Sequence, residues 1–91
     1  MYIIHSYSRK KAALLGVIIK SSIYLNKKID VFRKKIFLCS IGSSNYSDYP
    51  TYIQSHGLAY ANKRRLLYKK RHENDRHKKN TPGYFADNIL W

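Results

Sequence analysis

The segment from residue 63 to residue 79 holds the densest cluster of ionisable side chains, with nine basic residues against two acidic ones. Its central stretch, His72-Glu73-Asn74-Asp75-Arg76-His77, comes closest to the spacing of a metal site. The two histidines are five positions apart, which puts their rings about 140° apart on a helix, whereas ligands on one face need a spacing of four. We therefore expect solvated helix surface here rather than a metal or nuclease site.

The other groups with catalytic potential stand alone. Cys39 lies in an apolar run, where an inert buried thiol is expected, and a single cysteine excludes both a disulfide framework and a four-cysteine zinc site. His5 and His56 have no partner nearby in the sequence. The chain has no glycine-rich phosphate loop, no Ser-His-Asp set and no spaced pair of carboxylates. We therefore expect no enzyme, no metal, no cofactor and no small-molecule substrate.

The remaining chemical signal is the interleaving of basic and aromatic side chains in a strongly positive chain. Lys and Arg number 18 against 5 Asp and Glu, which gives a formal charge of +13. A field of that sign attracts nucleic-acid backbones, anionic lipid or acidic protein surfaces. The predicted polyanion contacts are Lys63, Arg64, Arg65, Lys69, Lys70, Arg71, Lys78 and Lys79 of the dense segment and Arg33, Lys34 and Lys35, and the predicted interface aromatics are Tyr46, Tyr49, Tyr60 and Tyr68.

Strand-like sequence dominates the first half of the chain. Residues 14–24 are apolar and rich in Val and Ile, which suits a strand, although residues 12–15 could open with a helical turn. Residues 29–32 and 36–41 are two further β-like runs. Arg33-Lys34-Lys35 connects these two runs without Asn-Gly chemistry, so we expect a loose or bulged hairpin loop. Residues 46–52 are predicted to be a tyrosine-rich connector, because Pro50 disfavours helix at the residue before it.

The second half of the chain is predicted to be helical. Gly57 precedes a segment at about residues 58–79 that is rich in Leu, Ala, Lys and Arg. Arg64 and Arg71 fall within its apolar stripe, so we expect at least one of them to be buried against the carboxylate of Asp48 or Asp87. The stripe consists of Tyr60, Ala61, Leu67 and Tyr68.

A short second helix is predicted to start at Thr81. This residue is a natural N-cap, and Pro82 suits the first helical position. Phe85, Leu90 or Trp91 should then pack on tyrosine-bearing surface of the long helix or the sheet.

The predicted fold class is therefore α+β, with a small antiparallel sheet of two or three strands, one long basic helix and a short C-terminal helix. Residues 1–91 form a single small basic domain, in which residues 1–13 either belong to the folded body or form a flexible arm. The longest apolar run is eight residues, 12–19, against the roughly 20 that a transmembrane helix needs. We expect no transmembrane segment.

Several short motifs occur in a fixed order from Gly42 onward. They are Tyr46-Ser47-Asp48-Tyr49, Arg65-x-x-Tyr68-x-x-Arg71-His72, Thr81-Pro82-Gly83-Tyr84-Phe85 and Ile89-Leu90-Trp91. In this order they resemble a family of small basic uncharacterised proteins from large double-stranded DNA viruses of algae and amoebae. The resemblance covers about the last two thirds of the chain. It implies a viral setting, in the virion or the interior of an infected cell, but no mechanism.

Two functions remain open at this point. In the first, the chain is a non-enzymatic structural protein of a virion, a minor capsid or cement component that bridges acidic surfaces of a large assembly. In the second, it is a sequence-independent nucleic-acid-binding protein that coats or condenses a genome. The charge favours the second, whereas nine tyrosines, whose rings suit protein interfaces, favour the first. We therefore predict the structural function, with nucleic-acid binding as the alternative.

Overall fold

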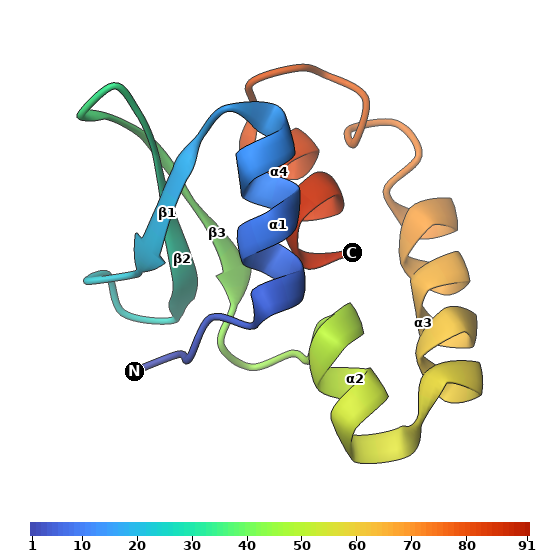
Figure 1. Ribbon diagram of the computed structural model, residues 1–91. Helices are drawn as coiled ribbons and strands as arrows, with labels where there is room; N and C mark the ends of the chain where they lie inside the picture. The colour runs from blue at the N-terminus through green and yellow to red at the C-terminus, as the bar shows by residue number, and fades with distance from the viewer.

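Three antiparallel strands and four helices make up the fold of residues 1–91, seen in a computed structural model (Figure 1). The elements are α1 (Ser6–Leu15), β1 (Ile18–Ser21), β2 (Lys27–Arg33), β3 (Ile36–Ser43), α2 (Tyr49–His56), α3 (Leu58–Arg71) and α4 (Pro82–Leu90). The strands lie in the order β1-β2-β3. The predicted α+β class and small antiparallel sheet are confirmed. None of the helices is long and apolar enough to cross a membrane.

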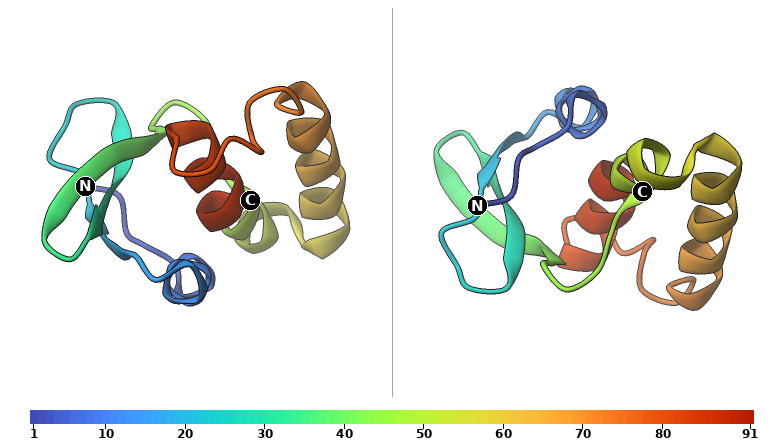
Figure 2. Two further views of the ribbon diagram at one scale, coloured as in Figure 1. Left: turned by 90° about the horizontal axis from the view of Figure 1, so that it is seen from above. Right: turned by 90° about the horizontal axis from the view of Figure 1, so that it is seen from below.

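The sheet buries one face against α1 and α4, and the helices leave its other face bare (Figures 1 and 2). On the covered face, Ile19 lies opposite Val31 and Ile29 lies opposite Ile41, and all four side chains are buried. Side chains alternate between the two faces of a strand, so these pairs fix which face each neighbouring residue occupies. The same core includes Phe85, Ile89 and Leu90 of α4.

The boundary between α1 and β1 falls inside the segment predicted to be one strand, residues 14–24. Helix α1 runs to Leu15, and β1 begins only at Ile18. Gly16 separates them with a left-handed φ of 73°, a conformation that ends helices at little cost for glycine. Most of segment 1–13 is helical, and α1 packs against β1 and α4. The strand prediction is right for residues 18–21 and wrong at the ends of the segment, and the helical turn left open for residues 12–15 is present. An apolar run suits a helix as well as a strand, and the glycine decides the boundary.

Helix α2 occupies the segment predicted to be a connector, residues 46–52. Asp48 caps its N-terminus, and its carboxylate accepts a hydrogen bond from the backbone N–H of Thr51 at 3.0 Å. Pro50 stands in the first turn, where its missing N–H has no helical partner to lose. The proline that argued against a helix therefore helps to start one.

The single long basic helix predicted for residues 58–79 is not present. Helix α3 ends at Arg71 after 14 residues, and residues 72–80 form turns, so His72 and His77 do not lie within a helix. Apart from His72 and Arg76, every residue from 72 to 80 is exposed. Helix stability in proteins comes mainly from packing an apolar face, and this segment has none to pack.

The β2–β3 hairpin turns through two residues, Lys34 and Lys35, and is tight rather than loose. Both adopt left-handed φ values, 50° and 68°, which two-residue hairpin turns require because they match the twist of the strands. The irregularity expected at the loop lies instead within the ladder, between Val31 and Phe32. Two lysines thus occupy positions that usually favour Asn and Gly.

The predicted start of α4 is confirmed. The side chain of Thr81 accepts a hydrogen bond from the backbone N–H of Tyr84, and Pro82 stands in the first turn. Trp91, directly after α4, stacks on Tyr68 of α3 with ring centroids 4.4 Å apart and planes 10° apart. The C-terminal helix therefore joins the sheet to α3, as its apolar residues predicted.

Candidate functional site

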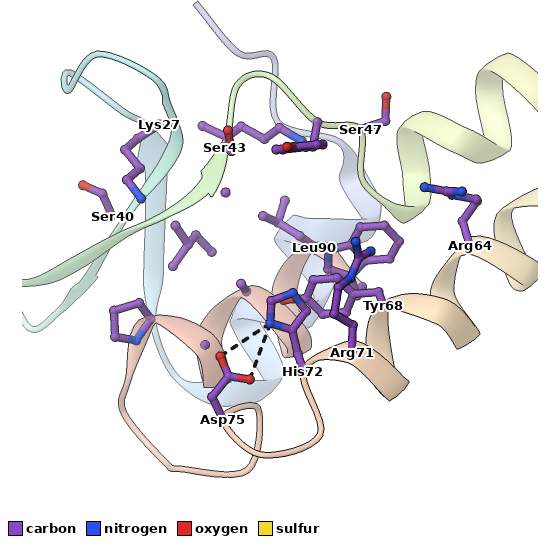
Figure 3. A pocket seen from close by; sticks show the side chains of 18 of the residues that line it. Lys27, Ser40, Ser43, Ser47, Arg64, Tyr68, Arg71, His72, Asp75 and Leu90 are labelled. Atoms are coloured by element: carbon purple, nitrogen blue, oxygen red, sulfur yellow. Dashed lines mark hydrogen bonds and ion pairs between the residues drawn. The ribbon is translucent and has the colours of Figure 1, made fainter.

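A cleft of about 490 Å³ opens between the β3 edge of the sheet, α3 and α4 (Figure 3). Its walls come from β2 and β3, the connector before α2, and helices α2, α3 and α4. This volume lies within the range of about 300–1,000 Å³ that ligand sites usually have. The side chains labelled around it in Figure 3 are Lys27, Ser40, Ser43, Ser47, Arg64, Tyr68, Arg71, His72, Asp75 and Leu90.

One wall of the cleft is held in place by the buried carboxylate of Asp48. It accepts hydrogen bonds from Lys28 Nζ at 3.0 Å, from the hydroxyl of Tyr2 at 2.6 Å and from the N–H of Thr51 at 3.0 Å. Burial alone would raise the pKa of Asp48, but these hydrogen bonds and the Lys28 charge together lower it. Lys28 lines the cleft, yet its charge is already neutralised by Asp48.

A second ion-pair network ties α3 to α4 through Asp87. Lys69 Nζ lies 2.8 Å from one oxygen of this carboxylate, and Arg76 Nη1 lies 3.5 Å from the other. Arg76 also donates to the exposed carboxylate of Glu73 at 2.7 Å. Lys69 is therefore engaged within the fold.

Arg64 and Arg71 are the free cations of the cleft. The prediction that one of them pairs with Asp48 or Asp87 is wrong, because Lys28, Lys69 and Arg76 occupy these carboxylates. Arg64 lies with its guanidinium 5.5 Å from the centre of the Tyr52 ring, and Arg71 is exposed. Lys27 lines the opposite wall, also without a carboxylate partner (Figure 3).

The aromatic wall of the cleft is built around Tyr68. Its ring stacks between His72 and Trp91, with centroids 4.4 Å away on each side. Burial, together with the nearby carboxylates of Asp87 and Asp75, raises the pKa of Tyr68 to about 12. The hydroxyl therefore stays protonated at neutral pH, as a hydrogen-bond donor rather than a base.

Asp75 is the one acidic side chain that lines the cleft without a Lys or Arg partner, and it lies 3.5 Å from His72 Nδ1. Ser43 and Ser47 also line the cleft, whereas the hydroxyl of Ser40, a third serine of the lining, donates to Asp30 at 2.6 Å. The site thus offers cations and hydroxyl groups, a combination suited to a phosphate group. No group of three or more metal-ligating side chains converges in the molecule.

The other predicted contact residues are spread over the surface. On α3, Lys63 and Lys70 are exposed, and Arg65 lies over the Tyr49 ring at 4.1 Å. Lys78 and Lys79 are exposed in the turns before α4. At the hairpin, Lys34 and Lys35 are exposed, and Arg33 Nη1 donates to Asn80 at 3.2 Å.

The four predicted interface aromatics have different positions. Tyr46 is exposed beside the cleft. Tyr49 is buried and donates to Asn62 at 2.7 Å, and Tyr60 stacks on His56 at 4.3 Å. Tyr68 lies within the cleft wall.

Sequence reasoning missed Lys27 and Tyr52 as cleft residues. Lys27 stands far from α3 in the chain, so nothing local could place it opposite Arg64. Comparisons with protein-family models, curated proteins and solved structures found no match to this chain. Function must therefore be inferred from the molecule's own residues.

Proposed function

We propose that this chain is a non-enzymatic, sequence-independent nucleic-acid-binding protein that uses its unpaired cations to neutralise phosphates. The observation that carries the proposal is how few of the cations are paired. Only three of the 18 Lys and Arg side chains, Lys28, Lys69 and Arg76, lie within ion-pair distance of a carboxylate. The remaining cations repel one another, and a polyanion relieves that repulsion.

The cleft supplies the most organised part of this surface. Arg64 and Arg71 project from one helix, Lys27 lines the opposite wall, and the Arg64 guanidinium lies over the Tyr52 ring. Arginine forms bidentate hydrogen bonds with phosphate. Such a site would recognise the phosphate backbone without reading base edges.

The positions of the tyrosines also support nucleic acid over an acidic protein surface. Tyr49 is buried, and Tyr68 is stacked between two other rings. Tyr2, Tyr7, Tyr52 and Tyr84 are partly buried against the core. Most tyrosines therefore stabilise the fold, whereas most of the cations remain available.

A second candidate is the structural one, in which the chain bridges acidic surfaces within a virion. It is favoured by exposed leucines on the outward side of α3, where Leu66 is 73% and Leu67 is 49% exposed, beside Lys63 and Lys70. Leucines flanked by lysines suit an acidic partner with an apolar centre. Location in the virion or the infected-cell interior is part of this proposal and rests on the viral resemblance of the motifs.

The first proposal is tested by fluorescence anisotropy with random-sequence oligonucleotides, single-stranded and duplex, at several salt concentrations. Two charge-matched double variants are compared, Arg64→Gln with Arg71→Gln in the cleft, and Arg9→Gln with Lys10→Gln on the exposed side of α1. The cleft variant should flatten the slope of log affinity against log salt by roughly 2 in the same way for every sequence. The α1 variant should change it less.

Equal effects of the two variants would refute the role of the cleft. Weak binding by the wild-type protein at every salt concentration would refute nucleic-acid binding altogether. The structural candidate would then remain, with its own requirement that Leu66→Ser weakens attachment to the assembly while Arg9→Gln does not.

A further inference from the structure

The bare face of the sheet carries apolar side chains that the fold does not cover. Ile18 of β1 lies opposite Phe32 of β2, and Phe32 lies opposite Phe37 of β3, so the three share one face. It is the face opposite Ile19 and Val31, and therefore the face away from α1 and α4 (Figures 1 and 2). Ile18 is 55% and Phe37 44% exposed.

The rings on this face form a connected aromatic platform, made of Tyr24, Phe32 and Phe37. The Phe32 and Phe37 centroids are 5.7 Å apart, and those of Tyr24 and Phe37 are 5.8 Å apart. Lys20 extends over the Phe32 ring, with its ammonium 5.4 Å from the centroid. The ring planes of Phe32 and Phe37 are 70° apart and those of Tyr24 and Phe37 are 51° apart, so a flat ligand can stack on one ring and not on all three at once. Tyr24 is 51% and Phe37 44% exposed, and both are open to such a ligand.

Positive charge surrounds the platform. Lys20 extends over Phe32, and Lys34 and Lys35 form the exposed hairpin tip, each two positions from a platform phenylalanine in the chain. Both tip lysines keep left-handed φ values that cost an ordinary residue energy, and backbone strain of this kind concentrates at functional sites.

The carboxylate on this face is buried and internally satisfied. Asp30 accepts hydrogen bonds from the hydroxyls of Ser22 and Ser40, both at 2.6 Å, and from the N–H of Ile23 at 3.3 Å. Exposed side chains on and around the platform are therefore apolar, aromatic or cationic. That pattern is complementary to a polyanion with exposed ring faces.

We propose that the platform stacks unpaired bases of single-stranded nucleic acid, while Lys20 and the hairpin-tip lysines contact the flanking phosphates. The inference rests on the proposed function and names its ligand class more closely. Bases in a duplex are already stacked on one another, so they cannot lie flat on Phe37, whereas a single strand can present them. The protein should therefore prefer single strands of any sequence over duplexes.

The test compares binding of a labelled oligothymidylate of about 12 nucleotides with binding of a duplex of equal length, for the full chain and three variants. Phe37→Leu keeps apolar area but removes the ring, Phe37→Tyr keeps the ring, and Leu66→Ala is the matched control on α3. Phe37→Leu should weaken single-strand binding roughly 5- to 150-fold, the range measured for loss of one stacked base. Its duplex affinity should be unchanged, and the other two variants should match the wild type.

A second measurement uses the wild-type protein and so does not depend on a variant folding. On addition of the oligothymidylate, the ring-proton resonances of Tyr24, Phe32 and Phe37 should shift upfield because of stacking, while those of Tyr49 stay in place. Thermal melting shows that each variant is folded.

Several outcomes overturn the inference. If Phe37→Leu leaves single-strand binding unchanged and the platform resonances do not shift, bases do not stack on this face, and the cleft proposal is unaffected. If Phe37→Leu weakens single-strand and duplex binding equally, the proposed preference for single strands is refuted. A wild-type dimer that Phe37→Leu dissociates identifies the face as a protein interface. If no oligonucleotide binds at any salt concentration, the proposed function itself fails along with the inference.

Discussion

Asp48 is the residue whose removal we expect to cost the fold most, because one carboxylate links three parts of the chain. It caps α2 through Thr51, pairs with buried Lys28 of β2 and accepts from Tyr2 near the N-terminus. Asp48→Asn isolates the ionic contribution, since Asn also caps helices well. It leaves the ammonium of Lys28, only 5% exposed, without a counter-charge.

The magnitude follows from that burial. Breaking a buried pair by removing one partner costs about 3–5 kcal/mol, a large part of the total stability of a small domain. With a urea slope of about 1.5 kcal/mol per M, a loss of 3 kcal/mol lowers the unfolding midpoint by roughly 2 M. Asp48→Ala also loses the cap and should cost about 1 kcal/mol more.

Urea unfolding of a double-mutant cycle measures this directly. Lys28→Met combined with Asp48→Asn removes both charges, so the double variant should be more stable than the sum of the single losses predicts, by up to about 3 kcal/mol. If the two single losses are each below about 1 kcal/mol and simply add, the pair does not stabilise the fold and the reasoning is refuted.

Three further predictions concern the backbone and acid stability. Gly42→Ala should lose about 1–3 kcal/mol in urea unfolding, because φ is 78° and a Cβ would lie 2.8 Å from the Leu90 side chain. Lys34→Asn with Lys35→Gly should raise the melting temperature by several degrees, because Asn and Gly adopt the left-handed turn conformation more easily than lysine. The same double variant should weaken single-strand binding, because it removes both hairpin-tip charges. Burial would raise the pKa of Asp30, but its hydrogen bonds lower it overall. The ionised carboxylate should therefore stabilise the fold above the ordinary carboxyl pKa of about 3.9, and this stabilisation should be lost as pH falls through the lower pKa of the folded state. Acid unfolding followed by circular dichroism should show this loss, and Asp30→Asn should make it smaller.

The parts of the fold that could be predicted from the sequence are those with local chemistry. Thr81 and Pro82 carry a cap and a first-turn proline in adjacent positions, and α4 begins there. Asp48 and Pro50 carry the same cap and first-turn chemistry at the start of α2, but in the sequence this signal competes with the restriction that proline places on its preceding residue. The error at α1 is different, because an apolar run of eight residues does not distinguish helix from strand.

For the candidate site, the sequence predicts the types of residue that take part but not which of them pair with one another. Arg64 and Arg71 stand out as arginines within an apolar stripe, but which carboxylates they reach depends on pairings across the fold. Lys28 is twenty positions from Asp48 in sequence, and no periodicity couples them. The length of α3 was overestimated for a related reason, because helical propensity continues past Arg71 where packing does not.

Strand β3 connects the two proposed contact regions, since Phe37 lies near its start and Ser43, at its end, lines the cleft. Six residues of strand at about 3.3 Å each separate them by roughly 20 Å. The hydrogen-bonded sheet keeps that separation fixed. A single-stranded nucleic acid bound at one region therefore presents its neighbouring phosphates to the other region at high effective concentration. Under the proposed function, neither stacking on the platform nor phosphate contact in the cleft then has to be strong alone, as binding without sequence readout requires.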